Sequence, residues 1–420
     1  MINKKINLKK LAPSGDKKIK WAGQRMPVLN LIAQNFAKSK PFKNLKIGAC
    51  LHVTTETANL ITTLKAGGAK IYLAGSNPLS TQDEVVAALT LYHQIPVFAY
   101  HGEDEKFYSQ ALKKILSLKP DLIIDDGADL ISLAVQTKNY RQIIGASEET
   151  TTGVVRIKNL EKNNELPFPT FAVNDARVKN LFDNRYGTGQ STIDGVIRAT
   201  NTLLSGKNFI VLGYGWCGKG LAQRAKGMGS SVFICEVDPV KALEARMDGF
   251  KVLPALEAAR IGDIFVTVTG NVDVLTAKHF LKMKDGAIFA NSGHFNVEIN
   301  IKDLDKLTKQ KRLIRNNLEE YTLKNKKRIY LLAEGRLVNL AAAEGHPSEV
   351  MDLSFATQAL SQEYLVKNAT KLDKKVYFLP KKIEEKIAFL KLKSMGIKID
   401  SLSPKQKNYM SSWDLGTLES

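Results

Sequence analysis

Short apolar runs alternate with longer stretches of helical spacing in the N-terminal part of the chain. Four runs have the length and composition of buried strands: 45–50, 69–73, 97–100 and 122–124. Residues 54–64 and 82–92 carry apolar side chains at the spacing of helices. Strands that alternate with helices form mainly parallel sheets with helices on both faces. The pattern predicts a doubly wound α/β domain.

A second alternation of the same kind begins near Asp194. Its predicted strands are 208–212, 231–235, 264–267, 287–290 and 329–332, and its first predicted helices are 219–226 and 239–246. After about His346 the pattern is mainly helical. We expect an α/β protein with two doubly wound parallel-sheet domains. The first comprises 1–185 with 347–395, the second comprises 186–346, and 396–420 form a C-terminal segment. The cleft between two such units is the usual ligand site.

Composition narrows the class of protein. No apolar run of the 420 residues approaches the ~20 needed to span a bilayer, and the basic N-terminus lacks the apolar stretch of a secretory signal. The three cysteines are too few for a disulfide framework or a zinc cluster, so we expect a cytoplasmic protein without a metal. The net charge of +19 comes from lysines spread along the chain without interleaved aromatic residues. This favours a solvated surface over nucleic-acid binding.

A glycine-rich loop follows the predicted strand 208–212. In Gly213-Tyr-Gly215-Trp-Cys-Gly218, the first glycine suits a tight turn and the second a close approach to a pyrophosphate. The third suits close packing of helix on strand, and the helix N-terminus offers free N–H groups to the anion. Glu236 ends the next predicted strand, where a carboxylate binds ribose hydroxyls and repels a 2′-phosphate. The loop therefore predicts NAD rather than NADP, although Lys241 weakens that preference.

Several further segments together resemble the S-adenosylhomocysteine hydrolase family. They are Cys50-Leu-His-Val-Thr-Thr-Glu-Thr57, Ser80-Thr-Gln-Asp83, Asp125-Asp-Gly-Ala-Asp129, Ser147-Glu-Glu-Thr-Thr-Thr-Gly153, Phe182-Asp-Asn-Arg-Tyr-Gly187, Asn291-Ser-Gly-His-Phe295, Ala333-Glu-Gly-Arg-Leu-Val-Asn339 and Gly345-His-Pro347. The resemblance runs in order from about residue 20 to about residue 400. It implies that the first domain binds substrate, that the second is a Rossmann domain for NAD, and that the chain forms a homotetramer.

The family's reaction explains why a hydrolase needs a nicotinamide cofactor. The resemblance implies that NAD oxidises the 3′-hydroxyl of the ribose, which acidifies the proton on C4′. Loss of that proton lets homocysteine leave from C5′. Water then adds to the 4′,5′ alkene, and the retained NADH reduces the ketone to give adenosine. The cofactor supplies the difficult chemistry, and the protein supplies geometry and proton transfers.

The resemblance implies roles for five residues near the reacting atoms. Lys179 and Asp183 hold the 3′-hydroxyl and assist its deprotonation, a role that suits a lysine if burial lowers its pKa. Asp126 lies near the C4′ proton. His52 is a candidate acid for the departing thiolate and base for the incoming water. His294 serves proton transfer near the 3′ and 4′ positions.

Two of these groups also have a purely structural interpretation. Lys179 and Asp183 could form a surface ion pair at i,i+4 spacing. The cluster from Asp125 to Asp129 could be a turn at the end of a strand. We expect Asp126 to be functional, Asp125 to be structural, and Asp129 to cap the following helix.

The remaining candidates are implied by the same resemblance. For substrate they are Thr54, Glu56, Asp126, Glu149, Lys179, Asp183, His346, Met351 and Phe355. For the cofactor they are Thr150, Thr151, Thr152, Asn184, Gly213, Gly215, Trp216, Cys217, Gly218, Glu236, Lys241, Thr269, Gly270, Asn271, Ser292, Gly293, His294, Asn339 and His346. Met351 and Phe355 would otherwise be ordinary helix core, and the threonine run a turn or a strand edge.

The chain departs from the family pattern in three places. Thr188 stands where a cysteine is common, and Lys241 where an asparagine usually contacts the cofactor ribose. The stretch 409–420 resembles the short subgroup, without the tail that lends a lysine and a tyrosine to a neighbouring subunit's NAD. This leaves open how NAD is held.

Other functions remain open at this point. The same chemistry on S-inosylhomocysteine would be favoured if Glu344 reached the purine, whereas Glu56 favours adenine, whose amino group donates to a carboxylate. A dehydrogenase that releases NADH would share the glycine loop but would not need the other motifs. A non-catalytic homologue would have lost catalytic positions, and all of them are present here.

Overall fold

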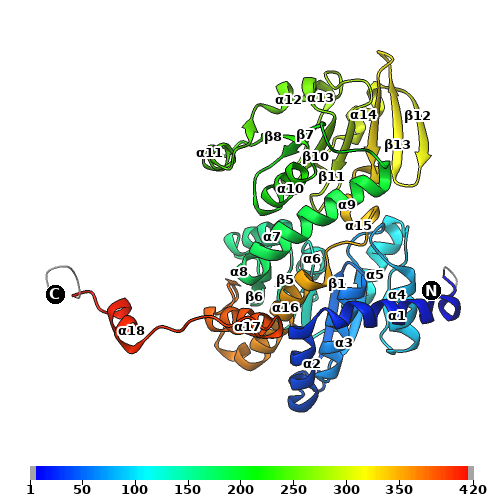
Figure 1. Cartoon of the computed structure of the whole chain (residues 1–420). Coiled ribbons are helices and arrows are strands. Elements are labelled where there is room, and N and C mark those ends of the chain that lie inside the picture. Colours follow the sequence, from blue (N-terminus) through cyan, green and yellow to red (C-terminus); the bar gives the residue numbers. More distant parts are fainter. Residues whose placement is uncertain (1–5, 415–420) are drawn as a thin grey trace.

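The computed structural model describes residues 6–414, which form two α/β units joined side by side (Figure 1). The first unit is built on a seven-stranded sheet in the order β15-β6-β5-β4-β1-β2-β3, with every neighbouring pair parallel. Its strands are β1 (Lys46–Leu51), β2 (Lys70–Gly75), β3 (Val97–Phe98), β4 (Leu122–Asp125), β5 (Gly145–Glu148), β6 (Thr170–Ala172) and β15 (Val376–Tyr377).

Helices cover both faces of this first sheet, which confirms a doubly wound arrangement. Side chains of α2, α3 and α16 pack in one core, and those of α5, α6 and α7 in the other. The helices are α1 (Leu8–Gln24), α2 (Pro27–Ser39), α3 (Thr55–Ala66), α4 (Asp83–Leu91), α5 (Glu105–Ser117), α6 (Asp129–Gln136), α7 (Thr151–Lys162), α8 (Arg177–Lys179), α16 (Ser348–Asn368), α17 (Lys381–Ser394) and α18 (Pro404–Ser411).

The second unit has an eight-stranded sheet in the order β12-β13-β14-β11-β10-β7-β8-β9. Its strands are β7 (Asn208–Leu212), β8 (Ser231–Cys235), β9 (Lys251–Val252), β10 (Ile264–Thr267), β11 (Ile288–Asn291), β12 (Thr308–Arg315), β13 (Leu318–Leu323) and β14 (Arg328–Leu332). Its helices are α9 (Thr188–Thr200), α10 (Trp216–Gly227), α11 (Pro239–Met247), α12 (Ala255–Ile261), α13 (Ala277–Phe280), α14 (Ile301–Leu307) and α15 (Val338–Ala341). The pairs β12–β13 and β13–β14 are antiparallel, and the other pairs are parallel.

The predicted elements are confirmed within a residue or two at most boundaries. The predicted strand 97–100 is an exception, because β3 ends at Phe98. The N–H of Tyr100 donates to a Glu103 carboxylate oxygen at 3.1 Å instead of joining the ladder. The sequence pattern did not reveal α1, α2, α5 or α7 to α9, nor the strands β5, β6, β9 and β15 and the antiparallel pair β12–β13. No described helix is long and apolar enough to cross a membrane.

The two units are joined where the chain passes through a π-helical segment, Asn180–Gly187, into α9. It returns through α15 into α16. Two glycines allow close packing at this junction. A Cβ atom on Gly220 would lie 1.7 Å from the carbonyl oxygen of Arg185, and one on Gly189 would lie 2.6 Å from the Gly220 backbone. This packing fixes the π-helical segment against the start of α10.

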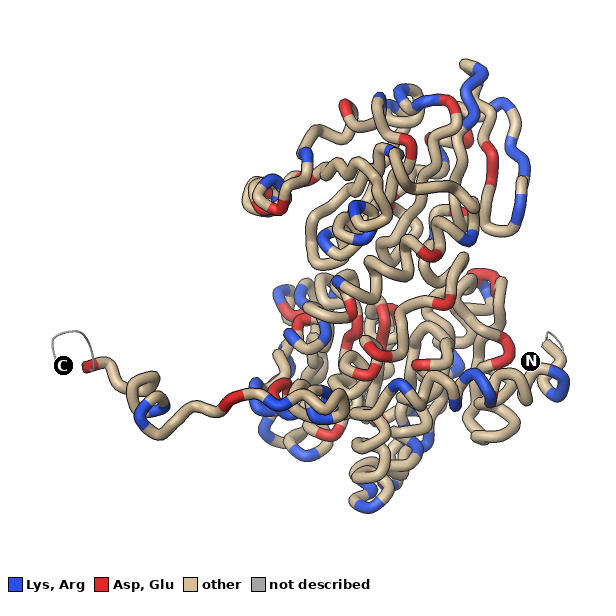
Figure 2. The backbone as a smooth tube through the Cα atoms, viewed as in Figure 1, with Lys and Arg blue, Asp and Glu red and all other residues tan. Residues whose placement is uncertain are grey.

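Charged residues are distributed over both units. Figure 2 shows Lys and Arg on each unit and on the C-terminal segment, with Asp and Glu between them. The segment after α17 extends away from the body and carries α18 (Figure 1). The prediction about the family's C-terminal tail concerns 409–420, of which 415–420 lie outside the described residues.

Asp352, on α16, joins three helices of the first unit. Its carboxylate accepts hydrogen bonds from the N–H groups of Val28 and Leu29, at 3.3 and 2.9 Å, in the first turn of α2. These N–H groups have no partner within their own helix, and the residue before α2, Met26, supplies no side-chain cap. Lys391 of α17 donates to the same carboxylate at 2.8 Å. Asp352 is fully buried, so this contact should contribute strongly to stability.

We expect Asp352→Ala to lower the free energy of unfolding by about 3 kcal/mol, because it leaves a largely buried lysine and two N–H groups unpaired. For a domain of this size, that corresponds to a fall of roughly 6–12 °C in the thermal unfolding midpoint. Asp373→Ala is the matched control, since its ion pair with Lys375 is exposed. Equal thermal unfolding midpoints for the two variants would contradict the stabilising role of Asp352.

Candidate active site

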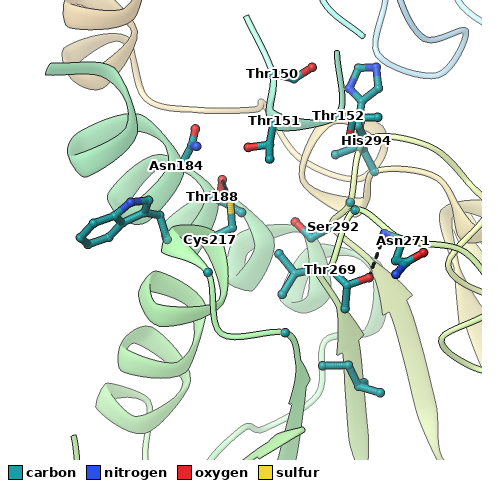
Figure 3. Close-up of a pocket in the computed structure, with 18 of the residues that line it drawn as sticks. Thr150, Thr151, Thr152, Asn184, Thr188, Cys217, Thr269, Asn271, Ser292 and His294 are labelled. Atoms are coloured by element: carbon teal, nitrogen blue, oxygen red, sulfur yellow. Dashed lines mark hydrogen bonds between the residues drawn. The ribbon is translucent and has the colours of Figure 1, made fainter. Parts of the chain in front are cut away.

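A single cavity of about 1350 Å³ is lined by residues from both units. It lies where strands of both sheets end, since His52 follows β1, Asp126 follows β4, and Glu236 follows β8. All the candidate site residues line it except Gly218. Figure 3 shows part of this lining, with Thr150–Thr152 and His294 on one side and Asn184, Thr188 and Cys217 on another.

The glycine loop has the geometry predicted for a dinucleotide. Gly213 adopts a left-handed backbone with φ of 109°, which suits the tight turn. A Cβ atom on Gly215 would meet nothing within 4 Å, so this position faces open space in the cavity. A Cβ atom on Gly218 would lie 2.1 Å from the carbonyl oxygen of Gly213. Gly218 therefore serves packing beneath the loop, which explains why it does not line the cavity.

Other residues near the loop also suit NAD. The Glu236 carboxylate accepts hydrogen bonds from the N–H groups of Tyr214, Val237 and Asp238, at 2.6, 2.7 and 3.1 Å, and it lines the cavity. The side-chain oxygen of Asn339 is buried and lacks a hydrogen-bond partner among the described residues. That oxygen suits the amide group of a nicotinamide. The residues present therefore fit the predicted cofactor.

Glu298 is a buried carboxylate that the sequence pattern did not single out. It accepts hydrogen bonds from the N–H and hydroxyl groups of Thr269, at 3.0 and 2.8 Å, and from the N–H of Gly270 at 2.7 Å. A Cβ atom on Gly293 would lie 1.7 Å from its Oε1 atom. Glu298 thus supports two loops of the cavity wall, one carrying Thr269 and Gly270 and the other ending in His294. No local motif signals this contact across the fold.

Lys179 lies at the centre of a buried polar cluster. Its Nζ atom is 3.0 Å from Asp183 and 3.7 Å from Glu149, and it donates to the side-chain oxygens of Asn184 at 2.7 Å and Asn174 at 3.3 Å. The alternative of a surface ion pair is wrong, because Lys179 and Asp183 are 3% and 2% exposed. Asn174 was not predicted from the sequence.

The pKa of Lys179 is not lowered, so the condition under which this lysine would suit deprotonation is not met. Burial alone would lower the pKa of this lysine, but the carboxylates of Asp183 and Glu149 outweigh that effect and raise it. Burial would raise the pKa of Asp183, yet Lys179 and His346 hold it well below its usual range. His346 Nδ1 contacts Asp183 directly, and its Nε2 lies 3.3 Å from the hydroxyl of Thr188. The Lys179–Asp183 pair is therefore charged at neutral pH.

Glu149 is held in place by α16. Gln358 donates to its Oε2 atom at 2.5 Å, and the hydroxyl of Ser354 donates to its Oε1 atom. Burial raises the pKa of Glu149 to about 7, even though Lys179 acts to lower it. Ser354 and Gln358 were not predicted. They are polar residues at i,i+4 spacing on a helix that is buried on most sides, and that pattern was a signal the sequence contained.

A second cluster combines two histidines and a carboxylate from both units. His52 Nε2 lies 3.5 Å from Asp126 Oδ2, and His294 Nδ1 lies 3.7 Å from Asp126 Oδ1. Burial lowers the pKa of His52 to about 4, against the opposing effect of Asp126, so this imidazole is neutral in the folded protein. Its Nδ1 atom lies 2.7 Å from the Ser80 hydroxyl. The spacing would also accommodate a metal ion, so the expectation of no metal stays a prediction.

The helix after β4 is capped differently from the prediction. Asp125, not Asp129, accepts the hydrogen bond from the N–H of Ile131, at 2.8 Å. The reason is that Asp129 occupies the first position inside α6 and turns to Arg156, at 2.6 Å, and to the hydroxyl of Tyr108, at 2.8 Å. The structural role expected for Asp125 is consistent with this contact.

The far wall of the cavity contains the purine candidates. Glu56 is buried, and the hydroxyl of Ser348 donates to it at 2.6 Å. Met351 and Phe355 line the same cavity. Glu344 does not line it, because its side chain is 66% exposed and lies 3.6 Å from Arg198. The idea that Glu344 reaches the purine is therefore wrong.

Comparison with known proteins adds independent evidence. The family model for "S-adenosyl-L-homocysteine hydrolase" matches residues 3–142, and that for "S-adenosyl-L-homocysteine hydrolase, NAD binding domain" matches residues 184–345. The chain is 60% identical to the adenosylhomocysteinase of Aquifex aeolicus, covering 97% of this chain and 98% of that protein. It is 57% identical to the adenosylhomocysteinase of Sulfurisphaera tokodaii, again covering 97% and 98%. A solved structure of a dipicolinate synthase from Bacillus halodurans is more distant, with 13% identity, 78% and 99% coverage, and a TM-score of 0.48.

The glycine loop yields a test of the cofactor site. We expect Gly215→Ala to lower the amount of nicotinamide nucleotide bound to the purified protein at least about tenfold, because the added methyl group points into the cavity. The thermal stability of the cofactor-free protein should not change. Gly218→Ala is the comparison, and it should lose both cofactor and stability, since its methyl group meets backbone. Normal nucleotide content in Gly215→Ala would place the pyrophosphate elsewhere.

Proposed function

The chain belongs to the S-adenosyl-L-homocysteine hydrolase family, and we propose how its cavity carries out that reaction. The activity is the reversible, NAD-dependent hydrolysis of S-adenosyl-L-homocysteine to adenosine and L-homocysteine. One observation carries the assignment of roles. The charged cluster around Lys179 and the cluster of His52, Asp126 and His294 line the same cavity as the glycine loop. A ribose between them would present its 3′-oxygen to one cluster and its C4′ hydrogen to the other.

Lys179 is proposed to act on the 3′-oxygen as a charged donor. Bound NAD supplies reversible removal of the hydride from C3′. Because the pKa of Lys179 is raised, its ammonium group suits hydrogen bonding to the 3′-oxygen and stabilisation of the negative charge that forms there. Asp183 orients this ammonium group at 3.0 Å. Glu149, with a pKa of about 7, is the nearby group that can hold a proton at neutral pH.

Asp126 and the histidines are proposed to handle the later proton transfers. Asp126 takes the C4′ proton once the neighbouring carbon is a ketone, and the thiolate of homocysteine leaves from C5′. Hydration then places a hydroxyl on C5′ and returns a proton to C4′. His52 is neutral, so it suits the base that activates the water better than the acid that protonates the thiolate. His294 approaches Asp126 from the NAD side and completes the cluster.

The purine wall favours the adenosyl substrate. Glu56 is buried in the cavity as a hydrogen-bond acceptor, which suits the amino group of adenine. The feature that favoured S-inosylhomocysteine was Glu344, whose side chain instead lies at the surface near Arg198. The comparisons likewise do not favour the inosyl alternative.

The assembly and location of the enzyme are further proposals. We propose a homotetramer in the cytoplasm, with the domain boundaries given by the sequence pattern: 1–185 with 347–395, and 186–346. Large apolar side chains on the extended C-terminal segment are exposed, including Tyr409, Met410 and Trp413, and this supports association. The thiols of Cys50, Cys217 and Cys235 are free, which supports a reducing compartment. Size-exclusion chromatography with light scattering tests the oligomeric state.

The direct test of function is turnover of S-adenosyl-L-homocysteine by the purified protein, with products separated by chromatography. We expect adenosine and homocysteine without stoichiometric release of NADH. Lys179→Met and His294→Ala should each lose roughly 10²–10⁴ in rate while retaining NAD, the usual size of a lost acid–base contribution. Lys179→Met should also fail to oxidise bound adenosine. Near-normal turnover in either variant would remove that residue from the mechanism.

The pKa of Glu149 predicts a pH dependence. Below about pH 7 the carboxyl group is protonated, and above it the carboxylate can accept hydrogen bonds from ribose hydroxyls. We therefore expect kcat/KM to rise with pH through an apparent pKa near 7. Glu149→Gln should lower kcat/KM and remove this limb, because the amide does not titrate. A limb that persists unchanged in Glu149→Gln belongs to another group.

A further inference from the structure

Glu148 is a buried carboxylate for which the proposed mechanism has no role. It ends β5, one residue before Glu149, but it does not line the cavity and is fully buried. Its Oε1 atom accepts three hydrogen bonds of 2.9 Å each. The donors are the N–H of Gly127, the N–H of Thr150 and the hydroxyl of Thr150. Its Oε2 atom has no partner among the described residues.

The three donors belong to two loops that face the substrate from different strands. Gly127 directly follows Asp126, at the end of β4. Thr150 precedes α7, where its hydroxyl also accepts the N–H of Gly153 at 3.3 Å. One carboxylate oxygen therefore sets the distance between the Asp126 turn and the threonine run on the cofactor side.

Both loops are shaped to admit this arrangement. A Cβ atom on Gly153 would lie 2.1 Å from the Cδ atom of Glu148, so the first turn of α7 has room for the carboxylate only because it contains glycine. Gly127 has φ of 107°, and a Cβ atom there would lie 2.3 Å from His294 Nε2. The turn that Glu148 contacts thus lies against His294 of the NAD unit, which is itself 3.7 Å from Asp126.

The Asp126 carboxylate has few contacts that fix its position. Its Oδ1 atom is buried without a hydrogen-bond partner among the described residues. Its contacts with His52 and His294, at 3.5 and 3.7 Å, are longer than hydrogen bonds. The position of its carboxylate is therefore determined mainly by its backbone. Besides Glu148, that backbone is held by Asp125, which accepts the Asp126 N–H at 3.0 Å, and by Arg156, which donates to the Gly127 carbonyl at 2.5 Å. The threonine run is likewise held by the first turn of α7.

We propose that Glu148 is a positioning residue for the elimination step. By accepting the Gly127 N–H, it holds the Asp126 carboxylate at the C4′ hydrogen, without touching substrate or cofactor itself. The proposal rests on the function proposed above. A shift of about 1 Å in a reacting group can cost roughly 10²-fold in rate. Loss of Glu148 should therefore slow proton removal at C4′ and leave oxidation at C3′ largely intact.

The experiment separates these two partial reactions in the holoenzyme. Adenosine is added, formation of reduced nicotinamide is followed by absorbance, and exchange of the C4′ hydrogen with deuterium oxide is followed by NMR. For Glu148→Ala we expect exchange to slow by about 10²-fold, with oxidation near the wild-type extent and KM little changed. Glu148→Gln should restore most of the exchange rate, because its amide oxygen can accept the same three hydrogen bonds.

Glu103→Ala is the matched control. Glu103 is also a buried carboxylate that accepts a backbone N–H, at 3.1 Å from Tyr100, but it does not line the cavity or contact either loop. It should leave both partial reactions unchanged. If Glu148→Ala does not fold, Glu148→Asp keeps a carboxyl group but shortens the side chain, and it should slow exchange selectively.

Several outcomes would overturn the proposal. If Glu148→Ala loses oxidation and exchange equally, Glu148 has a general structural role. If the exchange rate is unchanged, Glu148 does not position Asp126. A glutamine variant as impaired as the alanine variant would show that accepting the three hydrogen bonds is not the role of Glu148. Failure of the wild-type enzyme to exchange the C4′ hydrogen would instead contradict the proposed function itself.

Discussion

The buried ammonium group of Lys179 determines the protonation of the groups around it. Two carboxylates, from Asp183 and Glu149, face it in a region from which water is largely excluded. Burial of a lone lysine would make it neutral, whereas burial between two carboxylates keeps it charged. The same cluster lowers the pKa of Asp183 and leaves that of Glu149 near neutrality. An ammonium donor and a titrating carboxyl group thus lie side by side.

The fold brings this cluster to the cofactor through close backbone approaches. The π-helical segment that carries Asp183 and Asn184 packs against α10, and the glycines at 189 and 220 allow it. Side chains cannot intervene at such points, so the two units meet backbone to backbone. At the opposite wall, Gly127 leaves room for the side chain of His294 beside Asp126. Catalytic groups from different units can therefore share one cavity without a long side chain to bridge them.

Several residues that support the site from behind were missed by the sequence patterns, as was Asn174, which lines the cavity. Glu148, Glu298, Ser354 and Gln358 contact no open space in the cavity, yet each holds a side chain or loop that does. Their partners lie on other elements, as far away as 209 residues for Gln358 and Glu149. Local spacing carries no signal for such contacts. Only Ser354 and Gln358 could be noticed in the sequence, because they are polar residues on a helix that is otherwise largely buried.

The sequence by itself predicted much of the alternation of strands and helices and the glycine loop with Glu236, and the resemblance to the family implied about half of the residues that line the cavity. The elements and the glycine loop follow from local periodicity and backbone geometry. The other site residues were implied by motifs that resemble those of the family. Tertiary structure decided the charge of Lys179, the neutrality of His52, the cap supplied by Asp125 and the surface position of Glu344. The physical reason is that a pKa or a hydrogen bond depends on every group packed around a side chain. Those neighbours come together only when distant segments fold against one another.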